Sequence, residues 1–131
     1  MQEAETSLWS SGDSAVTGSD ARSAPGPEAA VRAQVRRVLT SGKFTRSVRR
    51  REFLTYIVEH SLAGQIEALR GDEIAVAVFA RGDDFDPQAD PVVRIEARRL
   101  RHDLDRYYEE EGLRDPVLIR VPKGGYRAVF T

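Results

Sequence analysis

The 131-residue sequence contains no cysteine, which excludes disulfide bonds, thiolate metal ligands and cysteine nucleophiles. It also has no apolar run close to the roughly 20 residues that a membrane-spanning helix requires. The first residues, MQEAETSLWS, are polar and acidic, so they lack the basic start and apolar stretch of a secretory signal. These absences together predict a soluble cytoplasmic protein that does not associate with a membrane.

Histidine is scarce as well, since His60 and His102 are the only two, and they fall on different predicted helices. No nucleophile set accompanies them, and the sequence KGGY at 123–126 lacks the spacing of a phosphate-binding P-loop. The acidic segment DDFDPQAD at 83–90 lacks the glycine and the final carboxylate that a calcium loop needs at its sixth and twelfth positions. We therefore expect neither catalysis nor a bound metal or cofactor.

The net charge of −1 conceals a division of charge along the chain. Residues 1–30 have five acidic side chains and one arginine, a balance of −4, so residues 31–131 have 19 basic and 16 acidic side chains, a balance of +3. Residues 1–26 are rich in Ser, Gly and Ala, and such a composition buries too little surface to offset the entropy of ordering. We predict a disordered acidic tail over 1–26 and one folded domain over 27–131.

Hydrophobic periodicity predicts the helices of the folded domain. Apolar residues with helical spacing indicate a first helix that begins after Pro25-Gly26-Pro27 and ends at Gly42. A second helix is expected between a cap at Ser47 and a stop at Gly64. The short apolar segment DEIAVAVFA, with Asp72 as its N-cap, fits either a third helix or a strand, because periodicity cannot decide over so few residues.

A long helix and a hairpin complete the predicted order of elements. The helix is expected over 91–111, with Asp90 as its N-cap and Pro91 at its first helical position, where the missing N–H has no cost. Two strands of alternating pattern follow within 117–130, and Gly124-Gly125 between them suits a two-residue turn. The order helix, helix, short helix, long helix, hairpin predicts an α+β fold.

Charge is unevenly distributed over the long helix. On a helical wheel, Arg94, Arg98 and Arg101 lie about one turn apart and form a ridge opposite the apolar stripe. The arginines are concentrated in the N-terminal half, although a helix dipole favours acidic side chains there. The stripe that we expect to face the core consists of Val93, Ala97, Leu100, Leu104, Tyr107 and Tyr108.

Two interpretations of the arginine ridge are open. A charged helix face is most often simply solvated, and a pair such as Glu96–Arg99 stabilises a helix by ~0.2–0.5 kcal/mol. Arginine is also the side chain whose planar fork holds guanine or a phosphate, and the N-terminal part of a recognition helix makes such contacts. The basic hairpin that directly follows the helix favours the second interpretation.

Three motifs resemble the winged-helix DNA-binding domains of the OmpR/PhoB type: RREFLTYIVEH at 50–60, LRHDL at 100–104 and VPKGGYRAVF at 121–130. Residues 30–130 are more closely similar to a bacterial winged-helix-like module that is found N-terminal to nucleotide-cyclase or tetratricopeptide-repeat regions. The resemblance implies a winged helix-turn-helix fold with a three- to four-helix core and a C-terminal hairpin wing. The chain is expected to be either a stand-alone protein or a piece of a larger one.

The resemblance also implies sequence-specific binding of duplex DNA in transcriptional regulation, with the helix 91–111 in the major groove and the wing 117–130 on the backbone or the minor groove. The alternative is a protein-interaction module on the same scaffold without DNA binding. The acidic segment 83–90 is a candidate contact for RNA polymerase or another regulatory protein, and symmetric half-sites in the DNA would indicate a homodimer. The candidate DNA-contacting residues are Arg94, Arg98, Arg99, Arg101, His102, Lys123 and Arg127, with Arg49 and Arg50 from a second basic cluster, RSVRRRE at 46–52.

Overall fold

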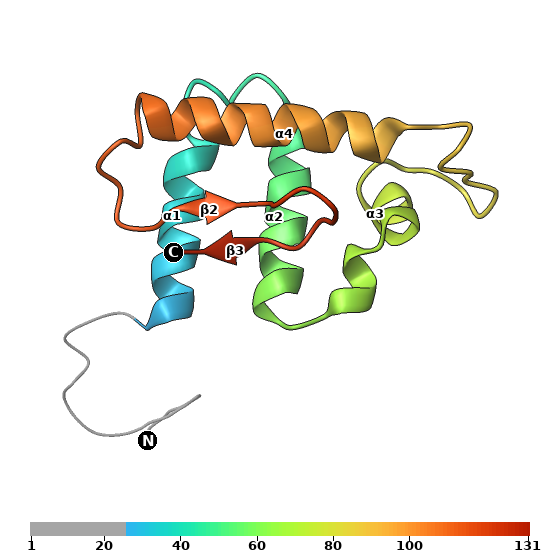
Figure 1. Cartoon of the computed structure of the whole chain (residues 1–131), viewed down its shortest axis with the longest axis horizontal. Helices are drawn as coiled ribbons and strands as arrows, with labels where there is room; N and C mark the ends of the chain where they lie inside the picture. The colour runs from blue at the N-terminus through green and yellow to red at the C-terminus, as the bar shows by residue number, and fades with distance from the viewer. Residues whose placement is uncertain (1–25) are drawn as a thin grey trace. The chain divides into compact units, whose positions relative to one another are not determined.

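A computed structural model of the chain describes residues 26–131, so the tail predicted over residues 1–26 lies outside the described residues apart from its last position. Within residues 26–131 the fold is mostly helical with one small antiparallel sheet, an α+β composition as predicted. Contacts within the chain define a compact unit from Val31 to Thr131. The elements (Figure 1) are α1 (Pro27–Leu39), α2 (Val48–Leu62), the 3-10 helix η1 (Ile66–Leu69), α3 (Gly71–Ala77), α4 (Val92–Glu109), β2 (Ile119–Arg120) and β3 (Val129–Phe130).

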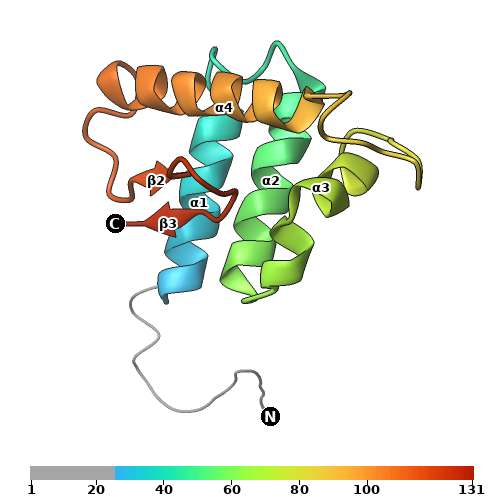
Figure 2. The ribbon, with the colours of Figure 1, turned by 45° about the vertical axis from the view of Figure 1, so that its right-hand side comes forward.

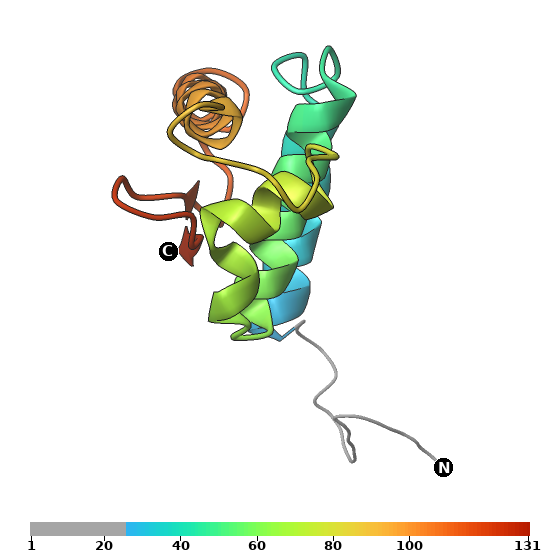
Figure 3. The ribbon, with the colours of Figure 1, turned by 90° about the vertical axis from the view of Figure 1, so that its right-hand side faces the viewer.

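Within the compact unit, α1 and α2 run side by side, and α4 lies across one face of this pair (Figures 1 and 2). An ion pair between Arg32 Nη2 and Glu59 Oε1, at 3.0 Å, joins α1 to α2. The hairpin of β2 and β3 covers the same face as α4 (Figure 3), and α3 packs against α4. The arrangement places α4 and the hairpin next to each other on one side of the unit.

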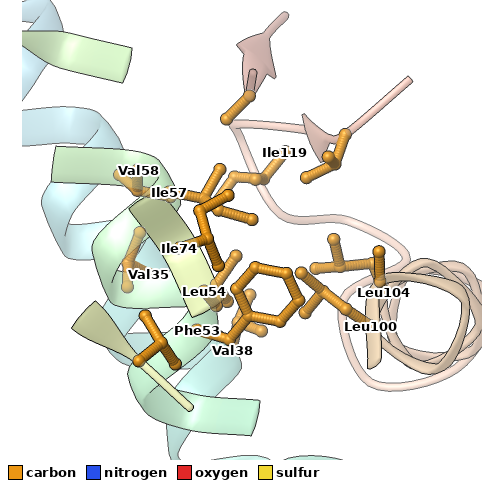
Figure 4. Close-up of a cluster of buried hydrophobic side chains, with 14 of the residues drawn as sticks. Val35, Val38, Phe53, Leu54, Ile57, Val58, Ile74, Leu100, Leu104 and Ile119 are labelled. Atoms are coloured by element: carbon orange, nitrogen blue, oxygen red, sulfur yellow. The ribbon is translucent and has the colours of Figure 1, made fainter. Parts of the chain in front are cut away.

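Side chains from all four helices and from β2 meet in one hydrophobic core (Figure 4). The rings of Phe53 in α2 and Phe79 after α3 meet edge to face, with their centroids 5.1 Å apart. Phe44 is fully buried and anchors the connection between α1 and α2 to this core. The stripe predicted for the long helix is confirmed, since Val93, Ala97, Leu100, Leu104 and Tyr107 are buried and Tyr108 is half-buried.

The predicted cap of the second helix is confirmed, because the Ser47 hydroxyl accepts a hydrogen bond from the Arg50 N–H at 3.1 Å. The segment that fitted either a helix or a strand is helical. Asp72 as its N-cap is wrong, because α3 already begins at Gly71. The Asp72 carboxylate instead accepts a hydrogen bond from the Arg70 side chain at 2.8 Å. An aspartate in the first turn still suits the helix dipole, which explains why the sequence signal lies two residues past the true cap.

α4 begins at Val92, so Pro91 and not Asp90 occupies the N-cap position. Asp90 Oδ1 nevertheless accepts a hydrogen bond from the Val92 N–H at 3.2 Å, which satisfies one of the open N–H groups at the helix start. Arg81 Nε donates to Asp90 Oδ2 at 2.6 Å, and this bond holds the pKa of the Asp90 carboxyl below its usual range. The same bond joins the two ends of the connection between α3 and α4.

The sheet is shorter than predicted. β2 and β3 each contribute two residues to the ladder. Arg120 and Val129 form the last pair before the loop. In the continued register Pro122 lies opposite Arg127, and a proline has no N–H with which to extend the ladder. The connecting loop therefore spans residues 121–128, and the prediction of a two-residue glycine turn between long strands is wrong.

Candidate nucleic-acid interface

The outer face of α4 presents the arginines that the sequence places opposite the core stripe. Arg94, Arg98, Arg99 and His102 are all exposed, because the helix buries the apolar residues of its other face. Ile95, at 38% exposure, lies among them as the one large apolar side chain of α4 that is exposed. α4 therefore turns a mainly cationic surface away from the core.

An open groove of about 670 Å³ lies between α4 and the loop 121–128, and we call it the hairpin-side groove. It brings together five of the nine predicted DNA-contacting residues. Four cationic side chains and one carboxylate line it, so its local net charge is +3 with the histidine neutral. The lining side chains that carry or can carry charge are Arg94, Arg98, Arg101, His102, Asp105 and Lys123.

Arg101 joins α4 to the hairpin loop. Its Nε donates to the Val121 carbonyl at 2.7 Å, and its Nη2 donates to the carbonyls of Gly125 at 2.8 Å and Pro122 at 3.3 Å. These bonds hold the loop against α4 in the part of the hairpin where the β ladder has ended. Because the partners are carbonyls, no carboxylate within the described residues pairs with Arg101, although fewer of its N–H groups remain for a ligand. Arg101 therefore shapes the groove as well as lining it.

The other cations of the groove have no carboxylate partner within residues 26–131. Arg94 Nη1 donates to the carbonyl of Pro87 at 2.8 Å, which orients the side chain and leaves its charge uncompensated. Arg98 and Lys123 are exposed and form no ion pair in the described part of the chain. The positive charge of the hairpin-side groove is thus available to an anionic ligand.

Two further predicted contacts lie near this groove without lining it. Arg99 Nη1 lies 3.0 Å from Glu96 Oε2, so its charge is paired along the helix, as in the intrahelical pair that the sequence allowed. Arg127 is exposed on the hairpin loop and has no ion-pair partner among the described residues. The structure therefore adds Arg127 to the unpaired cations and places Arg99 among the paired ones.

The second basic cluster contributes one arginine to the contact between two helices. Arg50 Nη1 lies 2.8 Å from Asp103 Oδ2, and its Nη2 lies 3.5 Å from Glu96 Oε1, with the side chain only 18% exposed. Arg50 therefore joins α2 to α4. Arg49 Nε lies 3.7 Å from Glu52 Oε1 on the surface of α2. Both arginines that the sequence assigned to DNA phosphates are thus paired with carboxylates of the chain itself.

A second groove of about 440 Å³ lies between α4 and the connection from α1 to α2, and we call it the loop-side groove. His102 lines this groove too, together with Lys43, Arg46 and Arg106. Hydrogen bonds from Lys43, at 2.6 Å, and from Arg106 hold the pKa of the Glu110 carboxyl below its usual range. Arg46 is exposed and has no ion pair within the described residues. The sequence placed Arg46 in the second basic cluster, and folding brings it beside α4.

Among the described residues, no helix is long and apolar enough to cross a membrane. Residues 26–131 also contain no group of three or more histidine, cysteine, aspartate or glutamate side chains placed to hold a metal ion. Comparisons of the chain with protein-family models, curated proteins and solved structures found no match, so its residues and their geometry provide the functional argument.

Proposed function

We propose that the protein binds duplex DNA through the hairpin-side groove and the exposed face of α4. The observation that carries this proposal is the collection of four cationic side chains in one groove against the single carboxylate of Asp105. Duplex DNA has one phosphate charge per about 1.7 Å of its axis, so a row of uncompensated cations suits its backbone. Arginine adds the ability to bind phosphate or guanine with two parallel hydrogen bonds.

The order of the elements supports a winged helix-turn-helix reading of the fold. In this reading α3 and α4 are the two helices of the motif, α4 is the recognition helix, and the hairpin with its loop 121–128 is the wing. The connection 78–91 between the helices is longer than the three or four residues of the compact motif. The Arg81–Asp90 ion pair, at 2.6 Å, closes this connection and keeps the start of α4 in place.

The dimensions of α4 support its insertion into the major groove. A helix with side chains is about 10–12 Å across, and the major groove is about 12 Å wide. In such a complex Arg94 and Arg98, one turn apart, reach base edges or phosphates, while Lys123 and Arg127 contact the backbone or the minor groove. Ile95 lies on the same exposed face and offers an apolar contact to a thymine methyl. Sequence preference, and with it a role in transcriptional regulation, would arise from these α4 side chains.

Salt-dependent binding of the full chain to a random-sequence DNA duplex tests the proposal. Each phosphate contact contributes about −0.9 to the slope of log K against log salt, so Arg94/Arg98→Ala should flatten the slope by up to about 1.8 and weaken binding. The matched control is Arg36/Arg114→Ala, which removes the same charge from two exposed residues outside α4 that form no ion pair within the described residues. Neither residue of the control lines a groove beside α4.

The outcomes separate an interface on α4 from a nonspecific charge effect. Equal losses of affinity and of salt slope in the two variants would show that binding follows net charge alone, and would contradict the proposal. If the wild-type chain does not bind the duplex even at low salt, the cationic face belongs to a protein partner, as in the alternative interpretation. Circular dichroism of each variant checks that its helices are intact.

A further inference from the structure

α4 has a groove on each side of His102. Arg98, Arg101 and the other α4 residues that line only the hairpin-side groove lie on one side of His102 on the helical wheel. Asp103 and Arg106, which line only the loop-side groove, lie on its other side. Because His102 lines both grooves, the two are neighbours across the exposed ridge of the helix.

A helix inserted in the major groove has a phosphate backbone on each side of it, since the groove is about 12 Å wide and is bordered by the two strands. The proposed function places one backbone along the hairpin-side groove. The other backbone then faces the opposite flank of α4, where the loop-side groove lies. A side chain that binds this second backbone must be a cation of that groove without an ion-pair partner.

The ion pairs of the loop-side groove single out Arg46. The charged side chains that line this groove, together with the carboxylates paired to them, are four cations and three carboxylates, and the Glu111 carboxylate lies beside Gly42. Lys43 and Arg106 share the carboxylate of Glu110, at 2.6 and 3.0 Å. Arg50 is paired with Asp103 and Glu96 and is 18% exposed. Arg46, exposed and without an ion pair in the described residues, supplies the uncompensated charge.

We propose that the loop-side groove binds the second phosphate backbone of the duplex, with Arg46 as the contacting residue. This inference rests on the proposed function and adds to it a second anion-binding site. Within the basic cluster at 46–52, which the sequence suggested as a phosphate contact, the inference selects Arg46. Arg50 is paired with Asp103 and Glu96, and Arg49 lies 3.7 Å from Glu52. Phosphate contacts on both flanks would fix the depth and rotation of α4 in the major groove.

The experiment compares Arg46→Gln with Arg36→Gln in the full chain, using the same random-sequence duplex and salt series. Arg36 is the matched control, because it is exposed on α1, forms no ion pair within the described residues and lines neither groove. We expect Arg46→Gln to flatten the salt slope by about 0.9 and to weaken binding about three- to tenfold at low salt. Arg36→Gln should leave both quantities unchanged.

Combining Arg46→Gln with Arg98→Gln tests whether the two grooves bind separate phosphates. The slope losses of the two changes should add, because independent contacts have additive effects. If Arg46→Gln binds like wild type while Arg98→Gln is impaired, the second site is overturned and the proposed function stands. If neither change affects binding, the proposed function fails and this inference fails with it. Arg46 is exposed, so the variant should fold, and a thermal melt verifies this.

Discussion

The backbone at Ala80 lies in the left-handed region, with a φ of 57°, directly after the last turn of α3. This conformation costs a residue with a Cβ about 1–2 kcal/mol. Glycine adopts it readily but loses more conformational entropy on folding. Ala80→Gly should therefore raise the free energy of unfolding by about 0.5–1 kcal/mol in urea denaturation. The control Ala77→Gly, at the last residue of α3, should not raise it, because Ala77 has no positive φ and glycine is a poorer helix former than alanine. A loss of stability in both variants would contradict this account.

Gly112, just after α4, is a position where any side chain should be destabilising. An added Cβ would overlap the ring of Tyr107, which is itself buried and donates its hydroxyl hydrogen bond to Asp115. Because the ring has no room to move, Gly112→Ala should cost about 1–3 kcal/mol of unfolding free energy, as overpacking does. Gly125→Ala is the control, since nothing lies within 4 Å of a Cβ at that position. Urea denaturation of the two variants measures the difference.

At the scale of elements, the hairpin loop depends on a contact made by a residue of α4. Arg101→Ala removes three hydrogen bonds to loop carbonyls, one part-buried and two exposed, which hold the loop against α4. We expect faster hydrogen exchange across 121–128 in this variant, with exchange in α2 unchanged. Arg98→Ala, which removes a charge from the same groove without a bond to the loop, should leave exchange in the loop as in wild type.

Sequence patterns predicted the helices well because their signals are local. The stripe of α4 and the cap at Ser47 follow from spacing within one element, and both are confirmed. The short helix η1 was missed, since four residues give no period to detect. The partners of Arg101 could not be predicted either, because they lie 20–24 residues away and are set by how the hairpin packs. The packing of distant segments also determines the position of Arg46 beside α4 and the pairing of Arg50 with Asp103 and Glu96.

For the whole molecule, several carboxylates that join distant elements have lowered pKa values. Hydrogen bonds from Arg32 to Glu59, and from Tyr107 and Gln34 to Asp115, hold both pKa values below their ordinary range. Each group binds protons less readily in the folded chain than in the unfolded one. Their stabilising effect is therefore fully present above the unfolded pKa of about 4 and is lost as the pH falls through the folded pKa.

The free energy of unfolding should accordingly be constant near neutral pH and decline below about pH 4, where these groups become protonated. Urea denaturation at a series of pH values measures this decline. Asp115→Asn removes one of the titrating groups, so the variant should be less stable at pH 7 and should lose less stability on acidification. An unchanged acid dependence in Asp115→Asn would show that this carboxylate does not contribute.

The termination of the ladder at Pro122 has a consequence for how copies of the protein meet at high concentration. An isolated hairpin exposes edge N–H and C=O groups that can template pairing with a strand of another chain. Here the Val121 carbonyl is bound by Arg101, the Ala128 N–H donates to the Ser61 hydroxyl at 2.9 Å, and Pro122 has no N–H to offer. These three backbone groups next to the sheet are thus occupied or missing. We therefore expect the contacts that attach the hairpin to α2 and α4 to oppose edge-to-edge pairing between copies.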